Sequence, residues 1–424
     1  MDLKERLEKI SKLQKRIDKI AFTSKNKSEK PKKKSGKKIE EILSGKFIET
    51  PFGKSFIREN YFPYDYMCGE ILLSQIFKSS THKFSHLIGD ERISKIDIHK
   101  TVFLDTETTG LSGGAGTFVF LVGLGYFTED QFCVRQYFMR DYNEEQALLS
   151  ALNELLLKFE SVITYNGKSF DLPLMETRFI ISGMEMNLKD PAHLDLLYPV
   201  RRLWKKRLEN CSLSTVERDI LGVHRENDVP GHLVPEIYFR YLRTGDARDI
   251  KGVFEHNLQD ILSLVVLTAK INDFFKEPLN DNFYPLDIFS LGKIYDKRKE
   301  YIKSSFYYNE ALKYNLPGEE FLEALKLISF AYKRQEKWEE AEKIWKKTIN
   351  KSREFIYYPY EELAKYYEHH LKDYKKAEEI VREALNMSEN VFIRKKLEYR
   401  LNRIKRHKKR GQATFLHDSK SKEK

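Results

Sequence analysis

The sequence predicts two folded parts: an α/β domain with a mixed sheet flanked by helices, followed by an all-α domain of helical repeats. In the first part, short apolar runs rich in β-branched and aromatic residues alternate with segments of helical periodicity. After Pro278, aromatic and small residues recur at a nearly constant spacing. We place the boundaries at residues 1–40 (basic tail, partly helical or disordered), 41–277 (α/β domain with an N-terminal extension), 284–402 (helical repeats) and 403–424 (basic disordered tail).

The positive charge of the chain lies at its two ends. The formal net charge is +11, and residues 1–40 hold 15 Lys/Arg against 6 Asp/Glu, while residues 403–424 hold 9 against 2. An apolar stripe that includes Leu3, Leu7 and Ile10 predicts a short helix in the first tail. Basic tails bind nucleic acid without sequence preference. A solubilising tail, a tail that seeks anionic surfaces and an amphipathic helix that touches membrane are the alternatives.

The first central strand of the α/β domain is predicted at Thr101–Leu104, and it leads into Asp105 and Glu107. Residues two apart on a strand point to the same face, so these two carboxylates project together. Adjacent carboxylates repel each other unless a positive charge lies between them, and hard divalent cations prefer oxygen ligands. The pair therefore indicates the start of a metal site. The alternative is a solvated strand edge that opens a Thr-Thr-Gly turn.

The following elements predict the rest of the sheet. Strands at Thr117–Phe127 and Gln131–Met139, joined by a short polar turn, indicate an antiparallel meander with the first strand. A helix is predicted at about Asn143–Phe159 from its apolar spacing. The strand Ser161–Asn166 then indicates a parallel addition. Residues 47–78 are apolar enough to fold as an N-terminal extension of this domain.

Three later residues are candidates to complete the site. Asp171 lies in the loop between the Ser161 strand and the next helix, where ligands gather in open α/β sheets, and its alternative role is a helix N-cap. His256 and Asp260 lie four residues apart in a long helical pattern and share one helix face. For that pair alone, an exposed surface pair is the more common case. Asp195 is assigned to capping a strand end and stays outside the catalytic set.

The ordered set of Asp105, Glu107, Asp171, His256 and Asp260 resembles the DEDD exonuclease superfamily on a ribonuclease H-like fold, in particular its YprB-like branch. The first motif is matched by the run Asp-Thr-Glu-Thr-Thr-Gly, the second by Asn166, Phe170 and Asp171, and the third by His256 with Asp260. Segments 193–197, 211–217 and 228–231 also resemble that branch. The third motif has the spacing of the tyrosine subtype but carries histidine in place of tyrosine.

This resemblance implies a metal-dependent nuclease, a 3′–5′ exonuclease that hydrolyses phosphodiester bonds of DNA or RNA, with a single strand or a 3′ end as its substrate. It implies two divalent metal ions, Mg²⁺ or Mn²⁺, about 4 Å apart, which clamp the attacking and leaving oxygens. The ions would be held by the four carboxylates of Asp105, Glu107, Asp171 and Asp260. His256 would orient or deprotonate the attacking water. Thr108 and Asn166, from the first two motifs, are the candidate substrate-binding residues.

Two other functions use the same residues. An inactive scaffold would bind nucleic acid and recruit a protein partner through its repeats, although it has no need to keep four like charges together. A metal-dependent nucleotide phosphatase would use the same ligands on small substrates. The glycine-rich stretch after Gly110 lacks the Gly-Lys-Ser/Thr ending of a P-loop, which argues against nucleotide hydrolysis of that type.

The helical part shows a repeating pairing of aromatic and small residues. Tyr301, Trp338 and Tyr374 each lie three positions before a small residue, so the register advances by 37 and then 36 residues (Ser304, Ala341 and Ala377). This pattern resembles degenerate tetratricopeptide repeats, whose period is about 34 residues. An unrelated helical bundle is the alternative. Repeat arrays present a concave surface, which implies a protein partner.

Composition limits the remaining possibilities. Cys68, Cys133 and Cys211 are far apart and form no metal or disulfide pattern, which fits a reducing cytoplasm. The N-terminus lacks the apolar core of a signal peptide. No apolar run is long enough to span a bilayer, so we expect a cytoplasmic protein without stable membrane insertion.

Overall fold

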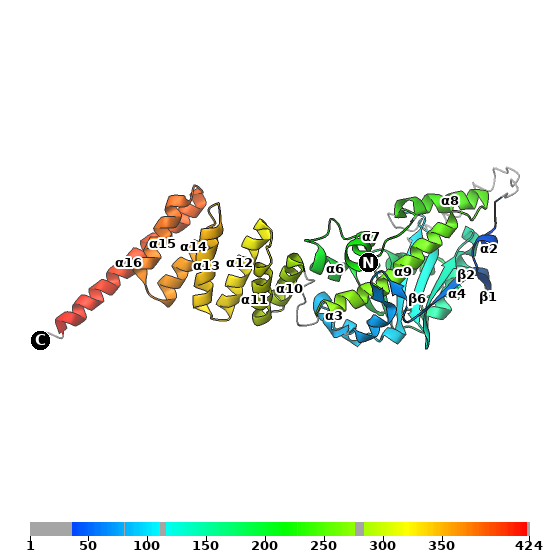
Figure 1. The fold of residues 1–424 in the computed structure, drawn as a ribbon, viewed down its shortest axis with the longest axis horizontal. Coiled ribbons are helices and arrows are strands. Elements are labelled where there is room, and N and C mark those ends of the chain that lie inside the picture. Colours follow the sequence, from blue (N-terminus) through cyan, green and yellow to red (C-terminus); the bar gives the residue numbers. More distant parts are fainter. Residues whose placement is uncertain (1–35, 80, 111–115, 227, 276–283, 422–424) are drawn as a thin grey trace. The chain divides into compact units, whose positions relative to one another are not determined.

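The structure is a computed structural model that describes residues 36–79, 81–110, 116–226, 228–275 and 284–421 (Figure 1). Side chains are described for the same residues except 81–83, 86 and 410–421. Contacts divide the chain into two compact units, Met1–Pro278 and Leu279–Lys424. Each unit is described by itself.

A mixed sheet forms the centre of the first unit (Figure 1). Within the described residues its strand order is β1-β2-β7-β6-β5-β8-β9. The strands are β1 Lys46–Thr50, β2 Gly53–Pro63, β5 Thr101–Thr108, β6 Val119–Phe127, β7 Gln131–Phe138, β8 Ser161–Thr164 and β9 Ala192–Asp195. The pairs from β1 to β5 are antiparallel, and β8 and β9 continue the sheet in parallel from β5. The predicted meander and its parallel addition are therefore confirmed.

Helices flank this sheet and complete the core. They are α2 Ile39–Ile42, α3 Thr81–Ile88, α4 Glu145–Leu156, α5 Asp171–Ile181, α6 Leu197–Trp204, α7 Leu213–Val216, α8 Val234–Thr244 and α9 Ile250–Asp273. Short helical turns are η1 Leu73–Lys78, η2 Glu91–Lys95, η3 Ile98–Lys100, η4 Tyr142–Glu144, the π-helical η5 Glu217–Leu221 and η6 Gly231–Leu233, and a small hairpin pairs β3 Met67–Cys68 with β4 Ile71–Leu72. Strand residues such as Val102, Leu104 and Leu121 pack with apolar residues of α4, α8 and α9. Ile39 of α2 is buried in the same core, so folded structure begins before residue 41.

Two glycines in β6 let α9 approach the sheet closely. A Cβ at Gly123 would lie 2.2 Å from Oδ1 of Asn257, and a Cβ at Gly125 would lie 2.4 Å from Cγ2 of Ile261. Both distances are far below van der Waals contact, so no larger residue fits while the helix keeps its position. The glycines therefore determine how near α9 comes to strand β5, which is paired with β6.

The second unit consists of helices, and the repeating register of the sequence marks where they begin. Tyr301, Trp338 and Tyr374 are the first residues of α11, α13 and α15. The small residues three positions later are fully buried. The elements are α10 Pro285–Lys297, α11 Tyr301–Lys313, α12 Gly318–Arg334, α13 Trp338–Lys351, α14 Tyr357–Lys365, the π-helical η7 Tyr366–His370, α15 Tyr374–Met387 and α16 Val391–Ser421.

The turn inside each helix pair repeats as well. Lys299, Glu336 and Lys372 have φ of 62°, 59° and 54°, and each lies two residues before the second helix of its pair. A non-glycine residue in this left-handed region is uncommon, so three at the same position mark the same turn used three times.

The C-terminal tail differs from the sequence prediction. The predicted disordered tail from residue 403 is wrong as far as residue 421, because helix α16 continues through it. Ile404 shows why, since it is buried in the core of this unit.

Nowhere in the described part of the chain is there a helix both long and apolar enough to cross a membrane. The three cysteines are free thiols.

Candidate functional site

Asp105 and Glu107 lie on the face of β5 that receives α9. Asp105 is paired with Gly123 and Glu107 with Leu121 of β6, so both share the face on which the small glycine leaves room for the helix. The ladder shifts register after Glu107, where the strand ends. The predicted side-by-side projection of the two carboxylates is thus present, and the glycine opposite Asp105 is the reason that α9 can reach them.

Asn257 of α9 fixes the carboxylate of Asp105. Its Nδ2 donates to Oδ2 of Asp105 at 2.8 Å and to the backbone oxygen of the same residue at 3.2 Å. Gln136 of β7 sets the orientation of this amide, because its Nε2 donates to Oδ1 of Asn257 at 2.9 Å and to the backbone oxygen of Phe254 at 2.8 Å. Sequence reasoning gave neither amide a role. The sequence did contain a sign that Asn257 has a role, because it is a polar residue within the apolar stripe that runs through Phe254 and Ile261.

Asp171 reaches the same place from the start of α5. Thr106, between the two carboxylates of β5, donates its hydroxyl to Oδ1 of Asp171 at 2.5 Å. The N-cap position of α5 belongs to Phe170, and Asp171 is the first helical residue. The alternative role as an N-cap is therefore wrong, and the charge of Asp171 acts on the carboxylates of Asp105 and Glu107.

His256 and Asp260 project from α9 across to β5. Nε2 of His256 lies 4.0 Å from Oε1 of Glu107 and 3.7 Å from Oδ2 of Asp260. Its Nδ1 lies 2.8 Å from Oδ1 of Asp228. The side chains of Glu107, His256 and Asp260 are 12%, 16% and 14% exposed. The alternative of an exposed surface pair is therefore excluded, because both α9 side chains are part of the carboxylate cluster.

Arg225 is the positive charge beside this cluster, and sequence reasoning missed it. Its Nη1 donates to Oδ2 of Asp228 at 3.2 Å, and its Nη2 donates to Oε1 of Glu217 at 2.5 Å and to Oδ1 of Asp260. The side chain of Glu217 is 1% exposed and also accepts from the hydroxyl of Ser263. Burial lowers the pKa of Arg225, but the carboxylates of Asp260 and Glu217 raise it further, so the guanidinium stays charged. Arg225 thereby holds Asp260 in place and compensates part of the local negative charge.

Burial, and for Asp105 and Glu107 also the neighbouring carboxylates, raises the pKa values of the site carboxyl groups. Burial and then the charges of Asp260, Glu107 and Asp171 hold the pKa of Asp105 well above its usual range. Burial raises the pKa of Glu107 to about 8, against the opposing effect of His256, and burial raises that of Asp171 to about 6. Burial lowers the pKa of His256, but the hydrogen bond to Asp228 and the nearby carboxylates raise it to about 9. These carboxyl groups therefore hold protons more tightly than usual, because burial and neighbouring like charges disfavour their charged forms.

The donor set fits a hard divalent cation in its chemistry. Four carboxylates supply only oxygen ligands, the type that Mg²⁺ and Mn²⁺ prefer, and the raised pKa values mark a position where a cation would be stabilised. Across the ranges that the structure describes, no group of three or more His, Cys, Asp or Glu side chains is already arranged to enclose a metal ion.

Of the two predicted substrate-binding residues, Thr108 lies at the end of β5 and Asn166 lies in the loop after β8. The hydroxyl of Thr108 donates to the backbone oxygen of Gly110 at 2.9 Å, at the end of β5. Asn166 has φ of 65°, and its backbone N–H donates to Oδ1 of Asp195 at 2.8 Å. Asp195 also accepts from the backbone N–H of Lys168 and that of Leu197, so it shapes the loop after β8. In the described contacts, neither the Thr108 nor the Asn166 side chain bonds to the carboxylates.

Comparison with known proteins supports the assignment of this region. Residues 102–272, which contain every candidate site residue, match the RNase_H superfamily. The chain is similar to the uncharacterized protein YprB of Bacillus subtilis (strain 168), with 32% identity over 362 residues, 82% of this chain and 85% of YprB. Among solved structures, the family B DNA polymerase from the hyperthermophilic archaeon Pyrobaculum calidifontis is similar at 15% identity and a TM-score of 0.35, over 49% of this chain and 28% of the polymerase chain.

Proposed function

This chain belongs to the family of YprB and carries an RNase_H superfamily domain, and from that premise we propose that it is a metal-dependent nuclease of the DEDD type. Its reaction would be the removal of nucleotides from the 3′ end of DNA or RNA. One observation carries the proposal: the carboxylates of Asp171 on α5 and Asp260 on α9 act electrostatically on Glu107 of β5, and Nε2 of His256 lies 4.0 Å from the Glu107 carboxylate. An inactive scaffold has no use for this concentration of like charge.

In the proposed reaction, Asp105, Glu107, Asp171 and Asp260 would hold two divalent ions, Mg²⁺ or Mn²⁺, which supply charge stabilisation for an in-line displacement and lower the pKa of bound water. Asn257 donates to one oxygen of Asp105, and the hydroxyl of Thr106 donates to one oxygen of Asp171, so each of these two carboxylates has one fixed oxygen. These amide and hydroxyl bonds orient the carboxylates before substrate arrives.

His256 is the proposed group that handles the proton of the attacking water. Asp228 binds Nδ1, which directs Nε2 toward Glu107 and Asp260. Burial lowers the pKa of His256, but the hydrogen bond to Asp228 and then the charges of Asp260 and Glu107 raise it to about 9. A cation bound by Glu107 and Asp260 would remove part of this upward effect on the pKa of His256, which favours Nε2 as an acceptor of the water proton.

We further propose that the helix pairs of the second unit are degenerate tetratricopeptide repeats. The turn with positive φ before α11, α13 and α15 and the shared small residues support this class. Arrays of this kind present a surface to a partner, so a protein partner is part of the proposal.

The direct test is digestion of 5′-labelled single-stranded DNA and RNA with Mg²⁺ or Mn²⁺. We expect a ladder that shortens from the 3′ end, abolished by Asp105→Asn. Glu255→Gln is the matched control, because Glu255 is also an α9 carboxylate but pairs with Arg58 at 2.9 Å. Binding without cleavage of either polymer would favour the scaffold, and cleavage of mononucleotides alone would favour the phosphatase.

A further inference from the structure

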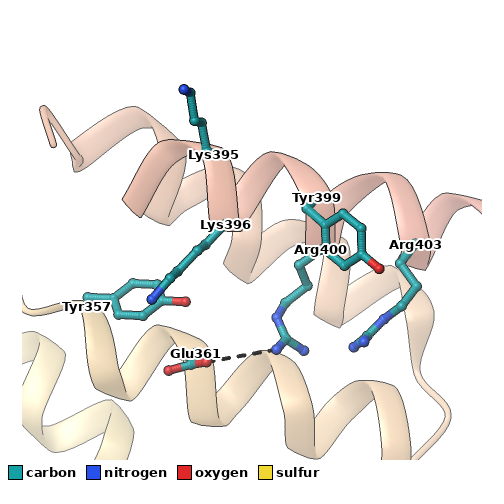
Figure 2. A pocket seen from close by; sticks show the side chains of 7 residues that line it. All are labelled: Tyr357, Glu361, Lys395, Lys396, Tyr399, Arg400 and Arg403. Atoms are coloured by element: carbon teal, nitrogen blue, oxygen red, sulfur yellow. Dashed lines mark ion pairs between the residues drawn. The ribbon is translucent and has the colours of Figure 1, made fainter. Parts of the chain in front are cut away.

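A groove in the second unit is lined by cations and aromatic rings that the proposed nuclease site does not use. It measures 390 Å³ and lies between α14 and α16 (Figure 2). Tyr357 and Glu361 of α14 form one side, and the other side comes from α16 (Lys395, Lys396, Tyr399, Arg400 and Arg403). Figure 2 shows Lys396 extending over Tyr357 and Arg400 reaching toward Glu361.

A buried carboxylate of η7 fixes the two arginines of this groove. Glu368 is 2% exposed and accepts from Arg400 at 3.0 Å and from Arg403 at 2.7 Å. A guanidinium has five N–H donors, so each arginine keeps donors that Glu368 does not use. A buried carboxylate that fixes two guanidinium groups side by side prepares them for an anionic ligand, because less side-chain freedom is lost on binding.

The two lysines of the groove are exposed cations without an ion pair in the described part of the protein. Lys395 and Lys396 are exposed, and no acidic side chain in the described part of the protein forms an ion pair with either of them. The positive charge continues along the helix: residues 391–409 contain nine Lys/Arg and one Glu. Such a surface attracts polyanions, and the attraction depends on salt.

An aromatic ring lies within this basic stripe. Lys395, Tyr399, Arg406 and Lys409 are spaced by four, seven and three residues, so they share one face of α16. Tyr399 is 73% exposed. At a rise of 1.5 Å per residue the stripe is about 21 Å long, which matches about six stacked nucleotides at 3.4 Å each.

We propose that this groove and stripe bind single-stranded nucleic acid, with phosphates on Lys395, Lys396 and Arg406 and a base stacked on Tyr399. Alternation of cations with an exposed aromatic ring is the pattern that such polymers need, since every base has a face that stacks. An acidic peptide would use the cations but not the ring. The inference deepens the proposed function, because it names a second contact for the same class of substrate.

The test measures binding in the full chain with Asp105→Asn, so that cleavage does not interfere. Anisotropy of a fluorescein-labelled single-stranded 12-mer is followed against salt, for DNA and for RNA. We expect Lys395→Gln/Lys396→Gln to weaken binding at least tenfold and to flatten the log–log salt slope by about 1.4, from about 0.7 per phosphate contact. Tyr399→Ala should weaken binding about five- to tenfold with the slope unchanged, in line with about 1–3 kcal/mol per stacked base.

The matched control is Lys343→Gln/Lys351→Gln, which removes two exposed lysines of α13 outside the groove. Equal loss in this control, or an unchanged slope in the groove variant, would overturn the proposal. So would groove-dependent binding of a poly-glutamate peptide together with undiminished oligonucleotide binding. A cleavage assay with the chain that keeps Asp105 separates the two proposals. Binding that depends on the groove, without any cleavage, would refute only the proposed nuclease activity. Cleavage together with binding that does not depend on the groove would refute only the proposed binding site in the groove.

Discussion

Replacing Arg225 by methionine should destabilise the first unit strongly, and divalent metal should restore part of the loss. Arg225 is 11% exposed and lies between Glu217 and Asp260, whose side chains are 1% and 14% exposed. Removal of the guanidinium leaves two buried carboxylates without their cation. Breaking a buried ion pair in this way costs about 3–5 kcal/mol. Arg225 is a positioning residue in this view, because it acts on the site through Asp260.

The opening free energy of α9 amides, measured by hydrogen exchange with EDTA and then with excess Mg²⁺, reports this effect for the first unit alone. We expect a fall of about 3–5 kcal/mol in EDTA. Mg²⁺ should return more stability to the variant than to the wild type, because the freed oxygen of Asp260 gains a cation. The control is Arg218→Met, whose pair with Asp219 is 55% and 32% exposed, so its loss should change the opening free energy far less. Equal losses in the two variants, or a loss that Mg²⁺ leaves unchanged, would refute this account of Arg225.

Three more predictions concern the first unit. Gly123→Ala should cost about 1–3 kcal/mol in urea unfolding and lower activity, since the new methyl group overlaps the fixed amide of Asn257, whereas Gly231→Ala, with open space around it, should change neither. Burial, and after it the charge of Lys168, lowers the pKa of His193 to about 4. As the pH falls from 6.5 toward 4, His193 therefore takes up a proton in the unfolded protein but not in the folded protein, and the free energy of unfolding should fall by about 3 kcal/mol. Unfolding measured over this pH range should show the decrease, and His193→Gln should reduce it. Asp105→Asn should raise the melting temperature in EDTA, because it removes one of several facing carboxylates, and should abolish stabilisation by Mg²⁺; a variant that Mg²⁺ still stabilises as much as the wild type would contradict Asp105 as a ligand.

Much of the sheet was predictable from the sequence because its signals are local. The apolar runs around Val102, Phe120 and Val134 and the short turns between them indicated the antiparallel order of β5, β6 and β7, which the structure confirms. The aromatic residues that open α11, α13 and α15 likewise marked the helix starts. Helix α16 was missed beyond residue 402, because its many charges resemble a disordered tail while its buried contacts, such as that of Ile404, are few and widely spaced.

The sequence by itself determined the chemical character of the site: carboxylates placed at the end of a buried strand, at a helix start and on a helix face, in the order of a recognisable family. Only the tertiary structure decided which groups support them. Asn257 reaches Asp105 across 152 residues of chain, and Arg225 reaches Asp260 across 35. The physical reason is that such contacts depend on how close α9 comes to the sheet. That distance is possible because Gly123 has no Cβ, although glycine itself carries no reactive or ligating side chain.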